Sequence, residues 1–252
     1  MLPSAIGRLK NLVALFLNGY RHLEGEILDL NGTSIFNQPE SVSLQDLYLG
    51  CRDKLQSLPE LPSSLQHLEL GGCNELRSLP ELPSSLQHLD LRGCDRLWLL
   101  PELPSSLQRL YVGGYDKLRS RLTLLQSLPE LPYSLQHLEL RGCGELRSLP
   151  ELPSSLQSLY LWGCKELRSL PEFPSSLQSL DLGDCEELRL LPKLPSSLQS
   201  LNLWDCKELR WLPELPSSLQ SLNLWGCKET KEALILLSKA LTYGVVRSSN
   251  RC

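Results

Sequence analysis

The sequence predicts a repeat solenoid in which short parallel β-strands stack into one sheet. A core of the form L-P-x-x-P recurs along the chain, and eight such cores contain 16 of the 18 prolines. The cores begin at Leu58, Leu79, Leu100, Leu128, Leu149, Leu170, Leu191 and Leu212. Each core leads into an L-x-L segment. Since one repeat of this length cannot bury its own leucines, the core has to come from stacking neighbouring repeats.

The repeat spacing sets the predicted domain boundaries. Successive cores are 21 residues apart, except for a step of 28 residues between Leu100 and Leu128. We interpret the seven additional residues, 118–124, as a loop insertion. The predicted domains are a solenoid over 1–229, with irregular repeats in 1–50 and regular repeats in 51–229, and a capping helix with a tail over 230–252.

The two halves of each repeat predict different backbone conformations. In the L-x-L segment the leucines point to one side and the intervening residues to the other, as in a β-strand. Two prolines three residues apart exclude a helix interior and favour extended backbone before each proline. We therefore expect a horseshoe of the α/β class with a parallel sheet on its concave side. Its convex side should be mostly extended or polyproline-like, with little helix.

Composition excludes several classes of function. The net charge is −4, with 25 basic and 29 acidic residues, so no general attraction to nucleic acid or an anionic membrane is expected. The sequence has no phosphate-binding loop, no H-E-x-x-H and no G-x-S-x-G motif. Without an enclosed cleft either, we predict a protein that is not an enzyme and binds no cofactor.

The cysteines follow the repeat. Seven of the nine share one position in the repeat, and Cys51 comes one place early. No C-x-x-C pair of the kind that binds zinc is present. We expect buried free thiols at the end of each strand, which indicates a reducing compartment.

Three columns of residues point away from the leucine core and vary from repeat to repeat, whereas the leucines barely change. Variation confined to one face of a constant scaffold is typical of a binding surface. Tryptophan and tyrosine often dominate the energy of such surfaces. An alternative interpretation is that the indoles only stack on each other and cover the sheet. The predicted partner-binding residues are Tyr111, Tyr160, Trp162, Trp204, Trp225, His67, His88, Arg92, Arg109, His137 and Arg141.

Histidines and carboxylates share the first half of this face. Neighbouring repeats carry His67 with Glu69 and His88 with Asp90, a combination that metals accept. Side chains in a column run parallel, however, and an open sheet closes no pocket around an ion. We therefore predict no metal site, and instead a charged patch that responds to pH near neutrality.

The repeat, as in residues 78–94 (S-L-P-E-L-P-S-S-L-Q-H-L-D-L-R-G-C), has the form of a leucine-rich repeat. It resembles the repeats of plant intracellular immune receptors of the TIR nucleotide-binding class, as do the L-P-S-A-I-G opening and the L-D-L-N-G-T-S-I segment. That resemblance implies a role in innate immunity and disease resistance, by sensing a pathogen effector or holding a receptor inactive in the cytoplasm or nucleus. Because the chain has no TIR or nucleotide-binding domain, only recognition of a protein partner carries over.

The N-terminal end carries no capping sequence, so an upstream domain or a partner is expected to cover it. Two alternatives to the immune receptor are open. The first is the L-P-x-L-P repeat domain of bacterial secreted ubiquitin ligases; Cys51-Arg52-Asp53 matches their C-x-D motif but lies within a repeat. The second is a structural or decoy array without a specific ligand.

Overall fold

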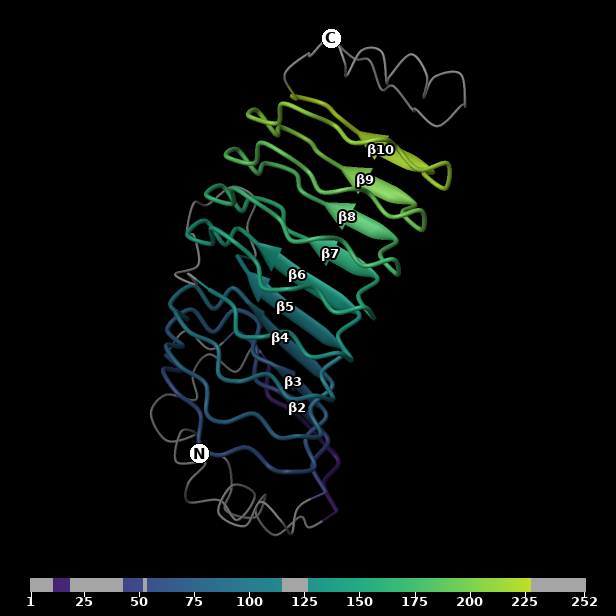
Figure 1. The fold of residues 1–252 in the computed structure, drawn as a ribbon. Helices are drawn as coiled ribbons and strands as arrows, with labels where there is room; N and C mark the ends of the chain where they lie inside the picture. Colours follow the sequence, from purple (N-terminus) through teal and green to yellow (C-terminus); the bar gives the residue numbers. More distant parts are fainter. Residues whose placement is uncertain (1–10, 19–42, 52–53, 115–126, 228–252) are drawn as a thin grey trace.

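The computed structural model describes residues 11–18, 43–51, 54–114 and 127–227 (Figure 1). Ten strands form one parallel sheet in which spatial order follows chain order. The strands are β1 (Ala14–Phe16), β2 (Asp46–Tyr48), β3 (His67–Glu69), β4 (His88–Arg92), β5 (Arg109–Gly113), β6 (His137–Arg141), β7 (Ser158–Tyr160), β8 (Ser179–Asp181), β9 (Ser200–Asn202) and β10 (Ser221–Asn223). The predicted parallel sheet and solenoid are confirmed.

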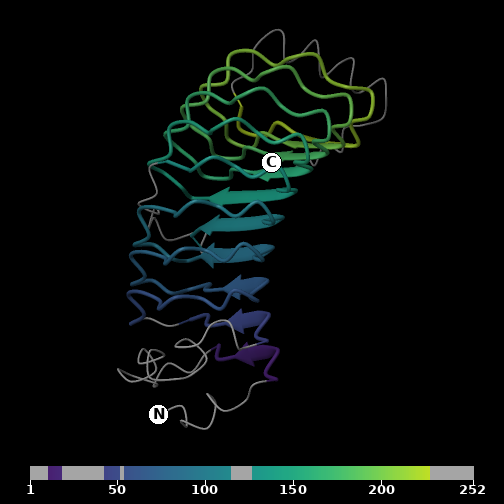
Figure 2. The ribbon, with the colours of Figure 1, turned by 60° about the horizontal axis from the view of Figure 1, so that its bottom comes forward.

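The connections between strands return on the opposite side of the coil, as Figure 2 shows, so the sheet lines one side only. No helix occurs in the described ranges, and the proline-containing segments are extended or turn-like. The backbone donor that each proline lacks would be needed inside a helix, which explains why these segments stay open.

The strand register reproduces the predicted columns. His67 pairs with His88, and Leu68 pairs with Leu89, each 21 residues further along the chain. The longer step also keeps the register, because Arg109 pairs directly with His137. The insertion predicted at 118–124 and the helix predicted within 230–252 both lie outside the described residues. So does most of the irregular region 1–50, although β1 pairs directly with β2.

Leucine fills the interior. The inward leucines of the strands, such as Leu68, Leu89 and Leu138, have no exposed surface. Burying a leucine side chain completely contributes about 1.5–3 kcal/mol relative to leaving it exposed. The same leucine positions recur in every repeat, so each strand adds a similar layer to one continuous core.

A ladder of serine hydroxyls joins successive repeats. In each P-S-S or P-Y-S turn, the serine two residues after the proline donates to a leucine carbonyl of the preceding repeat at 2.6–2.7 Å. The donors are Ser64, Ser85, Ser106, Ser134, Ser155, Ser176, Ser197 and Ser218. These bonds satisfy the carbonyl groups of leucines that lie two residues before a strand.

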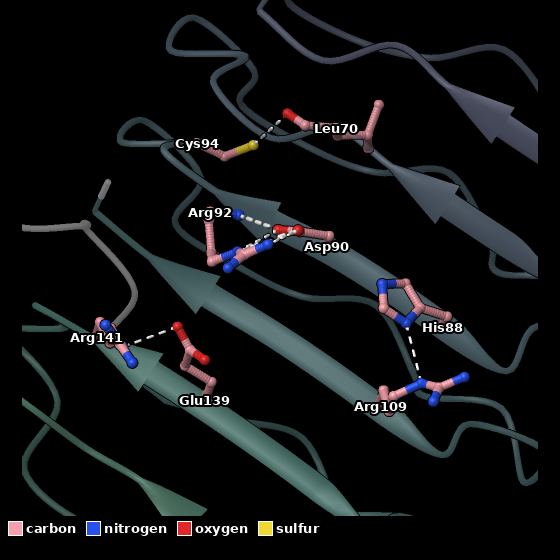
Figure 3. Close-up of polar contacts among 8 residues, drawn as sticks. All are labelled: Leu70, His88, Asp90, Arg92, Cys94, Arg109, Glu139 and Arg141. Carbon is pink, nitrogen blue, oxygen red and sulfur yellow. Dashed lines mark hydrogen bonds and ion pairs between the residues drawn. The ribbon is translucent and has the colours of Figure 1, made fainter. Parts of the chain in front are cut away.

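Cysteine thiols form a second ladder. Cys94 Sγ donates to the carbonyl of Leu70 at 3.4 Å, and Cys185 repeats this bond to Leu161 at 3.2 Å (Figure 3 draws the first). Burial raises the pKa of Cys206 to about 12, so the thiol remains a protonated donor. The expected buried free thiols are confirmed at Cys73, Cys94, Cys143, Cys164, Cys185 and Cys206.

Cys51 departs from this ladder and corrects the expectation for that residue. It is exposed, and its φ of 61° is in the left-handed region. In the next repeat the left-handed residue is Gly72, with φ 80°, which directly precedes the ladder residue Cys73. The displacement by one position therefore removes Cys51 from the buried site and puts it in the turn.

Candidate functional site

The open face of the sheet brings the predicted binding residues together. We call it the concave face and define it by the three outward columns that begin at Asp46, Tyr48 and Gly50 and recur in each repeat. In strands such as β3 and β8 the middle leucine is buried and the two flanking residues are partly accessible. All eleven predicted residues lie on or directly after strands β3 to β10.

Arginine neutralises the buried acids in the first half of this face. Asp90 is 1% exposed, and the Nε of Arg92 donates to its two carboxylate oxygens at 3.0 and 3.1 Å (Figure 3). Two strands further along, Arg141 Nε lies 2.9 Å from Glu139 Oε1. In both pairs the arginine is two residues after the acid on the same strand. Arg92 also places its Cζ 5.1 Å from the ring centre of Tyr111, a cation–π contact.

The histidines are held as neutral or partnered rings. Arg109 Nε donates to His88 Nδ1 at 3.2 Å, so that nitrogen is unprotonated. Burial, reinforced by the charge of Arg109, lowers the pKa of His88 to about 4, and the same two causes lower the pKa of His137. The expectation that this patch responds to pH near neutrality is therefore wrong for His88. Desolvation and neighbouring cations outweigh the tendency of histidine to protonate there.

The remaining predicted histidine has an acidic partner that the sequence interpretation did not select. His67 Nδ1 contacts the carboxylate of Asp46, its register partner on β2. Among the described residues, no group of three histidine, cysteine or acidic side chains is arranged to hold a metal ion. Phe16 and Tyr48, also not selected, stack with ring centres 4.4 Å apart. In both pairs the two residues lie opposite each other on neighbouring strands, so the strand register is the feature that identifies them.

Indole rings dominate the second half of the concave face. Trp162 and Trp204 stack with ring centres 6.5 Å apart and planes at 17°, and Trp204 and Trp225 stack at 5.8 Å and 5°. Trp225 is 67% exposed at the end of this stack. The interpretation that the indoles stack is thus confirmed, but stacking leaves the outer indole open to solvent.

Gly183 makes the stack possible. It occupies the tryptophan column two residues after β8, between the repeats of Trp162 and Trp204. A Cβ at Gly183 would lie 2.7 Å from Trp162 Cδ1, closer than side-chain atoms pack. The missing side chain lets Trp162 lean across one repeat toward Trp204. Sequence reasoning did not single out this glycine.

Residues 85–110, which span one repeat and part of the next, match the family model for the leucine-rich repeat. The chain is a leucine-rich repeat protein. Such proteins generally use their extended inner surface to bind other proteins.

Solved structures of several bacterial proteins are similar to the chain. YopM from Yersinia enterocolitica is 34% identical over 71% of this chain and 37% of its own, with a TM-score of 0.56. YopM from Yersinia pestis, described as a leucine-rich effector protein, is 32% identical over 71% of this chain and 60% of its own, with a TM-score of 0.40. The leucine-rich repeat domain of the type III effector XopL is 22% identical over 86% of this chain and 70% of its own, with a TM-score of 0.40.

The chain therefore spans little more than a third of the length of the first YopM. No curated protein is significantly similar to it in sequence. These comparisons do not confirm the resemblance to plant TIR receptors. No helix in the described part of the chain is long and apolar enough to cross a membrane.

Proposed function

We propose that the chain is a non-enzymatic recognition module that binds a protein through its concave face. The observation that supports this proposal is the contrast between an unchanging leucine core and a variable outer face that ends in an exposed indole stack. Large aromatic side chains on an accessible surface are the usual anchors of protein interfaces. Buried, protonated thiols fit a chain that works in a reducing compartment, and we propose the cytoplasm.

Two tyrosines provide a matched test. Tyr160 lies on the concave face in β7, and Tyr133 lies outside the sheet in the turn that precedes β6, with 88% of its surface exposed. Each is replaced, in a separate variant, by the photo-reactive amino acid p-benzoylphenylalanine, which resembles tyrosine in shape. Cells of the source organism are irradiated, and the crosslinked proteins are identified by mass spectrometry.

The expected result is one reproducible protein adduct from position 160 that excess unmodified chain suppresses, with no such adduct from position 133. The purified adduct partner then has to bind the unmodified chain in solution. Equal labelling from both positions, or an adduct from position 133 alone, would contradict the assignment of the concave face.

Two biological settings are compatible with this function, and one observation favours each. The 34% identity to YopM favours the repeat domain of a bacterial effector. The L-x-L-x-x-C-x-x-L repeats favour the sensor region of a plant immune receptor. Of the two we propose the effector setting, because the resemblance to YopM covers 71% of this chain in sequence and in fold.

The genomic sequence on both sides of the coding region tests the setting. A bacterial genome with a secretion-related locus nearby is the expected result. A plant genome in which the same reading frame continues into a phosphate-binding loop would contradict the effector setting, while leaving concave-face recognition intact.

A further inference from the structure

One acidic residue stands alone in the second half of the concave face. Asp181 is the only charged residue at the outward positions between Ser158 and Trp225, all of which the structure describes. Its Oδ1 accepts from the backbone N–H of Gly183 at 3.0 Å and from Asn202 Nδ2 at 2.8 Å. Within the described ranges Asp181 forms no ion pair, so its charge is not neutralised.

The residue that would neutralise Asp181 within its own strand has no side chain. Asp90 and Glu139 each pair with an arginine two residues further along the same strand, Arg92 and Arg141. Two residues after Asp181 the chain has Gly183 instead. The repeat therefore keeps the acid on β8 but omits the guanidinium that accompanies it on β4 and β6.

Aromatic residues neighbour both acids. Tyr111, which the Arg92 guanidinium covers, is the register partner of Asp90. Tyr160 is the register partner of Asp181, on the strand before the acid, whereas Tyr111 is on the strand after it. The Trp162 indole lies over Gly183 and stacks on Trp204, which adds a second aromatic surface. A carboxylate beside aromatic faces attracts a cation both by charge and by the ring quadrupole.

We infer that this site, formed by Asp181, Tyr160, Trp162 and Trp204, binds an arginine side chain of the protein partner. The partner supplies a guanidinium to Asp181 from the solvent side of the face, because the Trp162 indole fills the space directly over Gly183. Arginine fits better than lysine because its planar fork pairs with a carboxylate while stacking on an aromatic ring. This inference rests on the proposed function and names the chemistry by which the concave face recognises its partner.

Two peptides that differ in a single charge test the site directly. The probes are acetyl-Gly-Arg-Gly-amide and its citrulline counterpart, which has nearly the same shape but no charge. Binding is followed by the indole N–H signals of the full chain, labelled with ¹⁵N at its five tryptophans. We expect the arginine peptide to shift the signals of Trp162 and Trp204, and to leave those of Trp98 and Trp211, which lie outside the sheet, unchanged.

Two charge-matched variants supply the controls. Asp181→Asn keeps an oxygen for the Gly183 N–H but removes the charge, and it should weaken binding of the arginine peptide roughly tenfold or more. Asp205→Asn removes one charge from a turn where the carboxylate already pairs with Lys207 at 3.1 Å, and it should leave binding unchanged. The citrulline peptide should bind the unmodified chain as weakly as the arginine peptide binds Asp181→Asn.

Equal binding of the two peptides to the unmodified chain would overturn the inference, even if Asp181→Asn failed to fold. An equal loss in both variants would overturn it too, because the attraction would then be nonspecific. The outcome is separable from the proposed function. If a partner crosslinks at position 160 but the chain shows no preference for the arginine peptide, only the arginine site is contradicted. If the chain binds the arginine peptide but no partner is found, only the proposed function is contradicted.

Discussion

The indole of Trp162 occupies the space that a side chain at Gly183 would fill, with Cδ1 2.7 Å from the position of a Cβ on that glycine. Trp162 of one repeat thereby covers the outer surface of the next repeat. The stack with Trp204 depends on this exchange, because stacked strands are about 4.8 Å apart and the two tryptophans belong to repeats that are not adjacent.

Replacing Gly183 with alanine should break the stack. The added methyl group displaces the Trp162 indole, and overpacking of this kind costs about 1–3 kcal/mol. Near-ultraviolet circular dichroism of the folded variant should lose the signal of coupled indoles, and urea unfolding should give the free-energy loss. Ser200→Ala, on the neighbouring strand of the same face, should change neither quantity. An unaltered tryptophan signal in Gly183→Ala would show that the stack does not need the missing side chain.

Much of this face was predictable from the period alone. A fixed spacing of 21 residues makes columns such as His67 and His88, so register and the buried leucines follow from counting. The lean of Trp162 over Gly183 does not follow, because it depends on how side chains pack across repeats. Sequence reasoning also could not supply the pKa of His88, which is set by burial and by the neighbouring guanidinium.

Stability should fall between pH 6.5 and pH 4 in part because of His88. Its pKa is about 4 in the folded chain against an ordinary value of 6.5, so the unfolded chain binds more protons in this window and acid favours unfolding. Arg109 and Arg92, together with His67, oppose the ring's protonation, while Asp90 favours it.

His88→Asn isolates this effect, since the amide oxygen replaces Nδ1 as the acceptor for Arg109. Urea unfolding at a series of pH values should show that the free energy of unfolding depends less steeply on pH for the variant in this window. The difference in slope should correspond to at most one proton taken up on unfolding. Parallel curves for the two proteins would mean that His88 is not buried as a neutral ring.

The two serines of a P-S-S turn should differ in their contribution to stability. Ser155 donates to the carbonyl of Leu135 at 2.7 Å, whereas the hydroxyl of Ser154 is exposed. Ser155→Ala should lower the free energy of unfolding by about 1 kcal/mol, and Ser154→Ala should change it by less than about 0.5 kcal/mol. Chemical denaturation of both variants measures the difference. Equal losses would contradict a serine ladder made by the second serine alone.

Thiol chemistry should separate Cys51 from the ladder cysteines. Cys51 is exposed, whereas burial raises the pKa of ladder thiols such as Cys185 and Cys206 and keeps them unreactive. In a Cys252→Ser background, a disulfide reagent at pH 8 should modify one thiol rapidly and the others only as the chain unfolds. Peptide mapping should locate the fast modification at Cys51. Rapid modification of several thiols in the folded chain would contradict the buried ladder.

Recognition through the concave face is the central claim, and two tryptophans test it most directly. Trp225 ends the indole stack and is 67% exposed, while Trp211 is 56% exposed and lies outside the sheet. The measurement is the affinity of the partner crosslinked at position 160 for Trp225→Ala and Trp211→Ala, by calorimetry. We predict at least a tenfold loss for Trp225→Ala, as for an interface anchor, and wild-type affinity for Trp211→Ala. Wild-type affinity for Trp225→Ala, or a loss confined to Trp211→Ala, would contradict recognition by this face.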